Sequence, residues 1–272
     1  MIEAISTRGR EISINLRTFM KQNETLSWII RSSWLSLFVL AIWEVSVPLF
    51  DIQRAILPPP SDIIEAVFTN AGEFIHHAGI TLTAVGIGLV IGTISGLLFS
   101  MLIFYSITSR KTIYPLLISI AVIPKIALAP IFVVWFGSGL NTAVALTALI
   151  VFFPVMVNMY SGLSDMDEQK LMLAKSYGAS ESFIFRKLRL PYAAPYFVSS
   201  MKLAVVFSFI GAIVAEFIAA GAGLGYLIIN FTAYGQTTNA FAGITVIGLL
   251  SLIPYGIVSL IDRRYFAYSK NL

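Results

Sequence analysis

The chain lacks cysteine and is poor in charge. None of its 272 residues is cysteine, and only 12% are Asp, Glu, Lys or Arg. Without cysteine there is no disulfide framework, no thiolate nucleophile and no cysteine-ligated metal. A soluble domain has about 25% charged residues. Because 57% of the residues are instead hydrophobic, the composition indicates a multi-spanning membrane protein.

The sequence also lacks the motifs of several other classes. No stretch matches GxxxxGK[ST], so the chain has no phosphate-binding loop for ATP. Its only histidines are His76 and His77, and Glu73 is the one carboxylate at metal-ligand spacing from them, so we expect no metal site. The expected spans hold no histidine and no paired carboxylates, which argues against a membrane-embedded enzyme. The basic residues form no single patch, so no nucleic-acid partner is expected.

Apolar runs of about 20 residues predict transmembrane helices. The chain has six such runs, so we expect an all-α, polytopic membrane protein with six transmembrane helices. In the second run, Gly88, Gly92 and Gly96 predict a face for close helix packing. The approximate bounds of the runs are 26–50, 78–104, 113–136, 140–163, 196–220 and 240–261.

Segments outside these runs complete the expected organisation. Residues 1–25 are expected to form a cytoplasmic N-terminal segment, either an amphipathic helix on the membrane surface or a partly ordered tail. Residues 26–264 would form the transmembrane domain, and residues 265–272 a cytoplasmic C-terminal tail. A short helix is expected from Ser61 to Thr69, and a loop with a half-buried helix at 221–239.

Lysine and arginine are unevenly distributed between the connections. They gather in the N-terminal segment, at Arg110 and Lys111, in the connection 164–195 and at the C-terminus. The connections expected on the other side carry only Arg54. Because positively charged connections stay on the cytoplasmic side, both termini are expected in the cytoplasm. The protein would be a multi-pass component of the inner or plasma membrane.

The connection 164–195 is the longest charged and amphipathic segment of the chain. Its pattern predicts two short helices around a turn at Gly178, where glycine permits backbone angles that other residues avoid. A compact unit of this kind at a membrane surface is expected to dock onto a partner. The expected caps and stop are Ser164 with Asp167 for the first helix, Ser180 for the second, and Pro191 as its end.

The same connection resembles a motif of a known family. The run from Ala174 through Gly178 and Ala179, followed by a basic helix and Leu190-Pro191, resembles the EAA loop of ABC-importer permeases. Further similar segments are Leu57-Pro58-x-Pro60, the pair Pro124 and Pro130, Trp135-Phe136-Gly137, Phe153-Pro154 and Gly223-Leu224-Gly225-Tyr226. They resemble the branch that imports nitrate, sulfonate, taurine and vitamin precursors. The resemblance implies a type I ABC-importer permease fold with a cytoplasmic coupling helix.

In that family the loop docks into a groove of a separate ATPase. The resemblance implies that this chain is not an enzyme and holds no cofactor, with ATP and Mg bound by the ATPase. The implied assembly has two permease copies, identical or related, two cytoplasmic ATPase subunits and an extracytoplasmic binding protein. Met172 stands where the family has glutamate, so docking is expected to rest on shape and apolar contact. The expected coupling residues are Leu171, Ala174, Tyr177, Gly178, Ala179, Ser180, Arg186 and Lys187.

Two charged residues lie inside expected spans, Lys125 in the third and Glu216 in the fifth. A charge within the hydrocarbon faces a cavity or a partner, because burying it alone is costly. Pro124 and Pro130 interrupt the third span, as is tolerated where a helix lines a pathway. We expect these four residues along the translocation pathway. Lys125 either contacts an anionic solute or is held by Glu216 in a structural ion pair.

Two other functions stay open on sequence alone. A self-contained carrier or channel would need no ATPase, but such proteins often show two related halves, and none is evident here. A membrane-embedded enzyme would need a catalytic constellation that the spans do not offer. The solute also stays open, with nitrate, sulfonate, taurine, a pyrimidine precursor and riboflavin as the alternatives implied by the resemblance.

Overall fold

The computed structural model describes residues 34–219 and 221–266, and every regular element in these ranges is helical. The expected N-terminal segment 1–25 and most of the C-terminal tail lie outside the described residues. Two compact units, 1–64 and 65–272, are distinguished by their internal contacts and are described separately.

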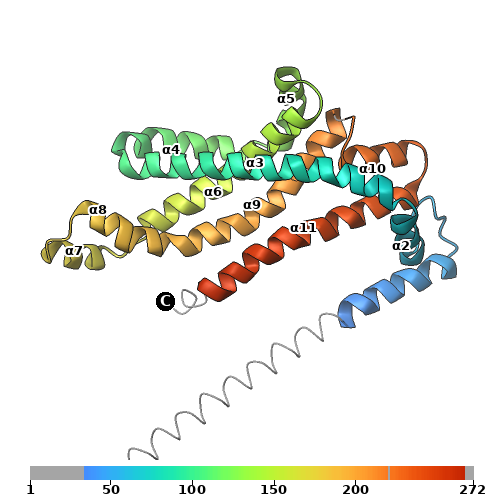
Figure 1. Cartoon of the computed structure of the whole chain (residues 1–272), viewed down its shortest axis with the longest axis horizontal. Coiled ribbons are helices and arrows are strands. Elements are labelled where there is room, and N and C mark those ends of the chain that lie inside the picture. Colours follow the sequence, from blue (N-terminus) through green and yellow to red (C-terminus); the bar gives the residue numbers. More distant parts are fainter. Residues whose placement is uncertain (1–33, 220, 267–272) are drawn as a thin grey trace, which may run out of the picture. The chain divides into compact units, whose positions relative to one another are not determined.

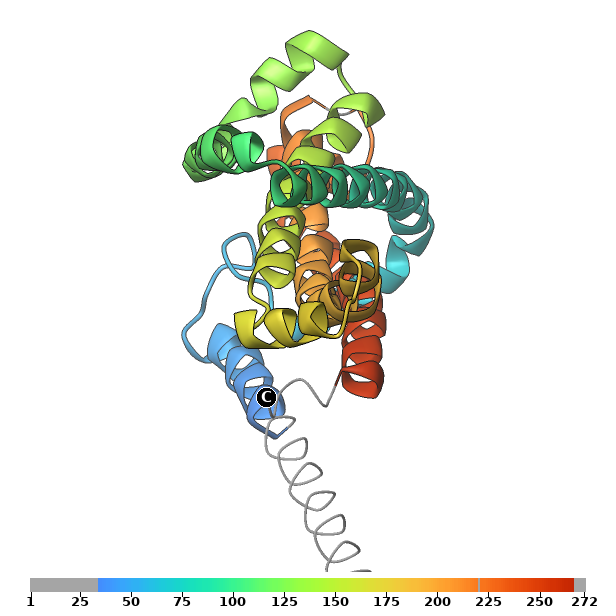
Figure 2. The same ribbon diagram turned by 90° about the vertical axis from the view of Figure 1, so that its left-hand side faces the viewer.

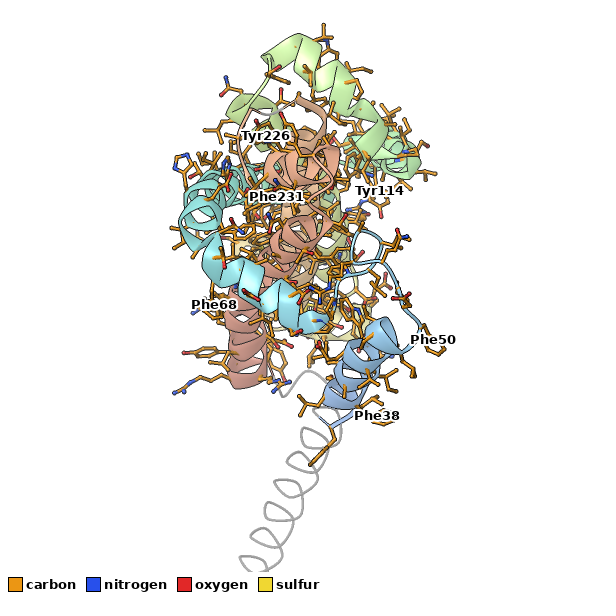
Figure 3. All side chains as sticks on the ribbon, turned by 90° about the vertical axis from the view of Figure 1, so that its right-hand side faces the viewer. Phe38, Phe50, Phe68, Tyr114, Tyr226 and Phe231 are labelled. Atoms are coloured by element: carbon orange, nitrogen blue, oxygen red, sulfur yellow. The ribbon has the colours of Figure 1, made fainter. Side chains whose placement is uncertain are left out.

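The first unit holds the apolar helix Trp34–Leu49 and the start of α2 (Pro60–Thr69). Its Phe38 and Phe50 project outward (Figure 3), and each is more than 60% exposed. Proline at the first helical position suits α2, because the N–H that it lacks would have no partner there. The backbone N–H and the hydroxyl of Ser61 both donate to the Glu44 carboxylate, at 3.0 and 2.7 Å. This contact fixes the start of the expected short helix.

The second unit is built around four long helices, which Figures 1 and 2 show together with the shorter helices of the unit. Helix α6 packs against both α3 and α9, and α11 packs against α9. The core lies between α3, α6 and α9, where side chains such as Leu146 and Ala212 are fully buried. The bounds are α3 Ala71–Tyr105, α6 Leu140–Ser164, α9 Leu190–Ala219 and α11 Thr237–Tyr265.

The glycine face of α3 packs directly on α6. A Cβ atom added to Gly92 would lie 2.6 Å from the Ala148 carbonyl oxygen, and one added to Gly96 would lie 2.9 Å from the Phe152 carbonyl oxygen. Backbone atoms cannot move aside as a flexible side chain can, so only glycine allows the two helices to approach this closely. The predicted packing face is confirmed.

The third expected span is broken. Helix α4 (Ile107–Val122) and the segment formed by the 3-10 helix η1 (Lys125–Leu128) and α5 (Ala129–Phe136) are bent by 87°. The break falls at Pro124, which cannot donate to the helical hydrogen-bond ladder, while Pro130 sits in the first turn of α5 where a missing N–H is tolerated.

Four described helices are long and apolar enough to cross a membrane, and there are five if the bent pair is counted as one span. The helix Trp34–Leu49 is shorter, and the first expected span begins outside the described residues. The count of six therefore stays a prediction, while the all-helical architecture with several membrane-spanning helices is confirmed.

Short helices fill the connections at the two ends of α9. Before it come α7 (Glu168–Ser176), α8 (Glu181–Ile184) and the π-helix η2 (Phe185–Arg189). After it comes α10 (Leu224–Ala233), as expected for 221–239.

The prediction that Pro191 ends a helix is wrong, because α9 begins at Leu190. The N–H of Leu190 donates to the Phe185 carbonyl, five residues back. The wider π turn comes directly before the proline, whose missing N–H then falls in the first turn of α9.

Candidate functional site

The connection between α6 and α9 forms the two predicted helices, each with a side-chain cap. Asp167 accepts a hydrogen bond from the Gln169 N–H at 2.8 Å and caps α7. Ser180 accepts from the Phe183 N–H at 3.3 Å and caps α8, as predicted. The prediction for Ser164 is wrong, because α6 continues to that residue and α7 begins only after Asp167.

Gly178 makes the turn between α7 and α8. Its φ is +76°, in the left-handed region that side-chain-bearing residues avoid. The Gly178 N–H donates to the Lys175 carbonyl at 2.9 Å, and the Ala179 N–H donates to the Ala174 carbonyl at 3.1 Å. These two bonds form a Schellman motif, the common glycine ending of a helix. The predicted turn is confirmed, and Lys175 also pairs with Glu181 across it at 2.7 Å.

The apolar side chains left free on α7 are Met172, Leu173 and Tyr177. Tyr177 is 84% exposed, while no residue of α7 is buried. Leu171 and Ala174, which were expected to share the docking face with Tyr177, are only half-exposed. Leu173 and Tyr177 are four residues apart and therefore lie on one side of the helix. That spacing is visible in the sequence, but the predicted face included Tyr177 and not Leu173.

Contacts on the membrane side hold the unit in place. Ile184 is 1% exposed. The Arg189 guanidinium donates to the Leu163 carbonyl at 2.6 Å and lies 4.9 Å from the centre of the Phe104 ring. These contacts tie η2 to the ends of α3 and α6. The unit is therefore anchored from one side and open on the other.

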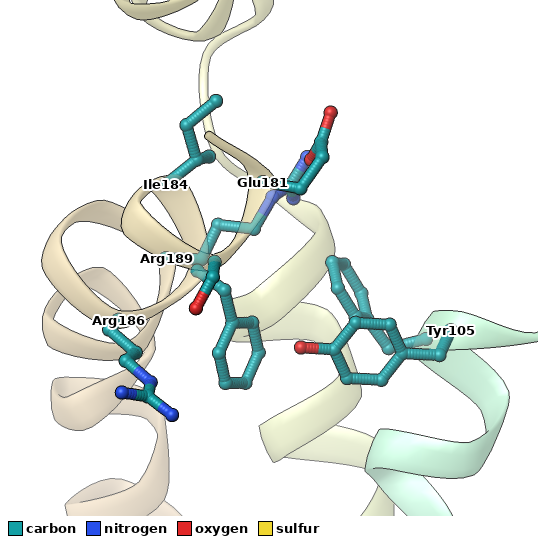
Figure 4. A pocket seen from close by; sticks show the side chains of 8 residues that line it. Tyr105, Glu181, Ile184, Arg186 and Arg189 are labelled. Carbon is teal, nitrogen blue, oxygen red and sulfur yellow. The ribbon is translucent and has the colours of Figure 1, made fainter. Parts of the chain in front are cut away.

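A pocket of about 500 Å³ lies between the end of α3 and the α8–η2 segment. Figure 4 shows Tyr105 on the α3 side and Glu181, Arg186 and Arg189 on the other. Arg186 and Lys187 are exposed and form no salt bridge within the described residues. Both expected basic coupling residues are thus accessible to a partner.

Lys125 and Glu216 do not contact each other. The Lys125 ammonium donates to the Ala121 carbonyl at 2.5 Å and lies 4.6 Å from the centre of the Phe153 ring. Its hydrogen bond goes to the carbonyl end of α4, which the break at Pro124 leaves without helical partners. The alternative in which Glu216 holds Lys125 is therefore wrong.

Glu216 instead holds the start of α10. It is 3% exposed and accepts from the Thr81 hydroxyl at 2.8 Å and from the Gly225 N–H at 2.8 Å. Thr81 in turn accepts from the Leu224 N–H at 2.8 Å. A carboxylate is favourable at a helix N-terminus because the free N–H groups point toward it. This network fixes α10 on α3 and α9, and buries a residue that was expected to line the pathway.

Residues 88–267 match the family described as "Binding-protein-dependent transport system inner membrane component". The chain belongs to this family. It is 33% identical over 236 residues to the formylaminopyrimidine transport permease protein ThiX of Halalkalibacterium halodurans, covering 86% of this chain and 94% of that protein. It is 27% identical over 235 residues to the putative aliphatic sulfonates transport permease protein SsuC of Bacillus subtilis, covering 86% and 85%.

Solved structures show the same fold. An inward-facing MetNI methionine ABC transporter matches with a TM-score of 0.61 at 18% identity, covering 71% of this chain and 96% of that one. An amino acid ABC transporter with histidines matches with a TM-score of 0.62 at 19% identity, covering 73% and 96%. The family and these folds make the chain the membrane permease component of an ABC importer for small solutes. ATP hydrolysis belongs to a separate subunit.

Proposed function

We propose that this permease couples to its ATPase through the segment 164–195 and moves an organic anion or a heteroaromatic vitamin precursor. The observation that carries the coupling is the turn at Gly178 with its free apolar face. Leu173 is 59% exposed and Tyr177 is 84% exposed, beside a backbone fixed by two hydrogen bonds. Apolar side chains gathered on a rigid, exposed turn are typical of a binding surface.

The docking face has an apolar centre and a basic margin. Met172, Leu173 and Tyr177 supply the centre, and Gly178 and Ser180 hold the turn and the next helix in place. Arg186 and Lys187 lie farther along the chain and are exposed. Because Met172 replaces the carboxylate of the family motif, apolar contact supplies the affinity, and the basic residues contribute orientation. Leu171 and Ala174 support the face from its half-buried side.

The complete transporter holds two copies of this chain, two cytoplasmic ATPase subunits that bind ATP and Mg, and an extracytoplasmic binding protein. Both termini and the segment 164–195 lie in the cytoplasm. The distribution of lysine and arginine supports this orientation, because nearly all of them fall in connections on one side. The family description supports the binding protein as the source of the solute.

Capture of the ATPase tests the coupling. The tagged full-length chain is purified from its native membrane, and the soluble ATPase that stays bound is quantified. Gly178→Pro is expected to abolish capture, because proline fixes φ near −65° while Gly178 has +76°. Gly235→Pro is the matched control, since Gly235 has φ +72° in a turn beyond the other end of α9.

The control variant is expected to keep the ATPase bound. Capture by wild type that survives in Gly178→Pro would overturn the assigned docking segment. Transport by the purified chain alone, with no ATPase and no ATP, would instead support a self-contained carrier.

A further inference from the structure

A second pocket, also of about 500 Å³, lies between the α4–η1 break, α6 and α9. Its polar lining residues are Lys125 and Asn158, and its apolar wall includes Ile150, Phe207 and Ile210. Pockets that bind small molecules have volumes of roughly 300–1,000 Å³ and join an apolar lining to a few polar groups. This pocket has the size and the mixed lining of a small-molecule site.

The pocket lies at mid-height of two membrane-spanning helices. Its lining residues on α6 fall at 150–158 of a helix that runs from 140 to 164. Those on α9 fall at 207 and 210 of a helix that runs from 190 to 219. Lys125 therefore places a cation near the middle of the membrane, where a charge without a partner is costly.

No carboxylate among the described residues pairs with this cation. The three salt bridges of the described chain join other residues. Glu216, the carboxylate within α9, is occupied by Thr81 and Gly225. The ring of Phe153 and one carbonyl of α4 are the contacts of the ammonium. Neither of them neutralises its charge.

Hydrogen-bond donors remain free beside the pocket. An ammonium has three N–H donors, and the described residues accept only one of those on Lys125, through the Ala121 carbonyl. The Asn158 amide donates one N–H to the Pro154 carbonyl at 2.8 Å, which leaves its second N–H. A positive charge and an amide N–H thus share one apolar pocket, as recognition of an anionic head with an apolar body requires.

We propose that this pocket binds the transported solute during passage, and that the solute is a small organic anion with a sulfonate or carboxylate on an apolar body. The anionic head pairs with Lys125 and Asn158, and the body packs against Phe207 and Ile210. This inference rests on the proposed function, since the pocket belongs to a permease, and it narrows the solute to the anionic class.

Equilibrium binding to the captured transporter, reconstituted in nanodiscs, tests the assignment. The probes are benzenesulfonate and uncharged benzenesulfonamide, which share a ring and differ in charge, with empty nanodiscs as background. Wild type is expected to bind the sulfonate about tenfold more tightly, because a charge-assisted hydrogen bond is roughly twice as strong as a neutral one. Lys125→Met removes the preference, and Lys125→Arg keeps it.

Lys111→Met is the matched control, since Lys111 is an exposed lysine at the opposite end of α4, and it is expected to keep the preference. Asn158→Leu weakens sulfonate binding about threefold, as expected for loss of one hydrogen bond, and it decides the matter if Lys125→Met does not fold. Equal binding of both probes by wild type overturns the inference, as does a preference that survives in Lys125→Met.

ATPase capture, measured on the same samples, separates the two proposals. A Lys125→Met transporter that keeps its ATPase but loses the sulfonate preference supports the anion pocket. A wild-type transporter that captures its ATPase but shows no sulfonate preference overturns the proposed anion pocket and leaves the proposed coupling intact.

Discussion

Helices α7 and α10, which lie in the connections before and after α9, end in the same kind of turn. Only the turn that follows α7 is proposed to dock onto the ATPase. Helix α7 is followed by Tyr177 and Gly178, and α10 is followed by Tyr234 and Gly235. Both glycines have positive φ, +76° and +72°, and both turns make the paired backbone bonds of a Schellman motif. The tyrosines are 84% and 75% exposed. In backbone terms the two turns are alike.

Their surroundings differ. Helix α10 buries one side, including Leu227, Ile228 and Phe231, whereas α7 buries no residue. Five residues before its tyrosine each helix carries an exposed apolar side chain, Ile229 (46% exposed) on α10 and Met172 (65% exposed) on α7. Four residues before the tyrosine, α10 has the half-buried Asn230, whereas α7 has Leu173, which is 59% exposed. A tyrosine–glycine turn is therefore not a docking site by itself. An exposed leucine on the same side of the helix as the exposed tyrosine distinguishes the proposed coupling segment.

The largest effect on stability is expected from a substitution on the buried side of α10. Phe231 is 8% exposed, and its ring lies edge-on to Phe74 with centroids 6.1 Å apart. Phe231→Ala should lower the free energy of unfolding by about 3 kcal/mol, as large-to-small substitutions in a core do. Leu173→Ala on α7 should leave it nearly unchanged, because Leu173 is 59% exposed. Thermal denaturation in detergent measures the melting temperatures of both variants, and equal shifts from wild type would contradict the expected difference between α10 and α7.

A smaller difference in stability is expected between substitutions at two glycines, Gly223 directly before α10 and Gly178 after α7. A Cβ atom on Gly223 would collide with the Glu216 carboxyl group, and Gly223 has φ +108°. Gly223→Ala should therefore lower the free energy of unfolding by about 2 kcal/mol or more, because backbone strain and the collision act together. Gly178→Ala meets no atom within 4 Å, so only the left-handed strain of about 1 kcal/mol remains. The two melting temperatures test this order, and a larger loss in Gly178→Ala would reverse it.

The smallest expected effect is local to the coupling segment. Ser180→Ala removes the hydroxyl that accepts from the Phe183 N–H, at a cost of about 1 kcal/mol. Hydrogen exchange should accelerate at the first amides of α8, with no change in the turn of α10. Ser176→Ala is the control, because the Ser176 hydroxyl donates within α7 to the Leu173 carbonyl and caps no helix. Equal hydrogen-exchange rates at these amides in the two variants would show that Ser180 does not stabilise α8 as a cap.

Local chemistry made part of this molecule predictable from its sequence. The turn at Gly178, the cap at Ser180 and the break at Pro124 each follow from what one residue can or cannot do with its own backbone. A face for close helix packing around Gly92 followed from glycine spacing. These features need no knowledge of distant neighbours, and all of them are present in the structure.

Features set by distant contacts were not predictable in the same way. Which side chains of α7 stay exposed depends on the tertiary structure around the helix, so Leu173 was missed as an exposed residue. The partners of Glu216 come from Thr81, 135 residues away, and from the start of α10. Pro191 lies in the first turn of α9, directly after a π turn, where its missing N–H is tolerated. The usual helix-ending role of proline does not reveal this placement.

The proposed coupling places the ATPase on the turn of α7 and not on the similar turn of α10. Its most direct test is the affinity of the purified chain for the purified ATPase subunit, measured for Tyr177→Ala and Tyr234→Ala. Because truncating a tyrosine at the centre of an interface costs about 2 kcal/mol, Tyr177→Ala should raise the Kd at least roughly tenfold. Tyr234→Ala should leave the Kd unchanged. Equal affinities for the two variants would overturn the assignment of the ATPase to the turn of α7.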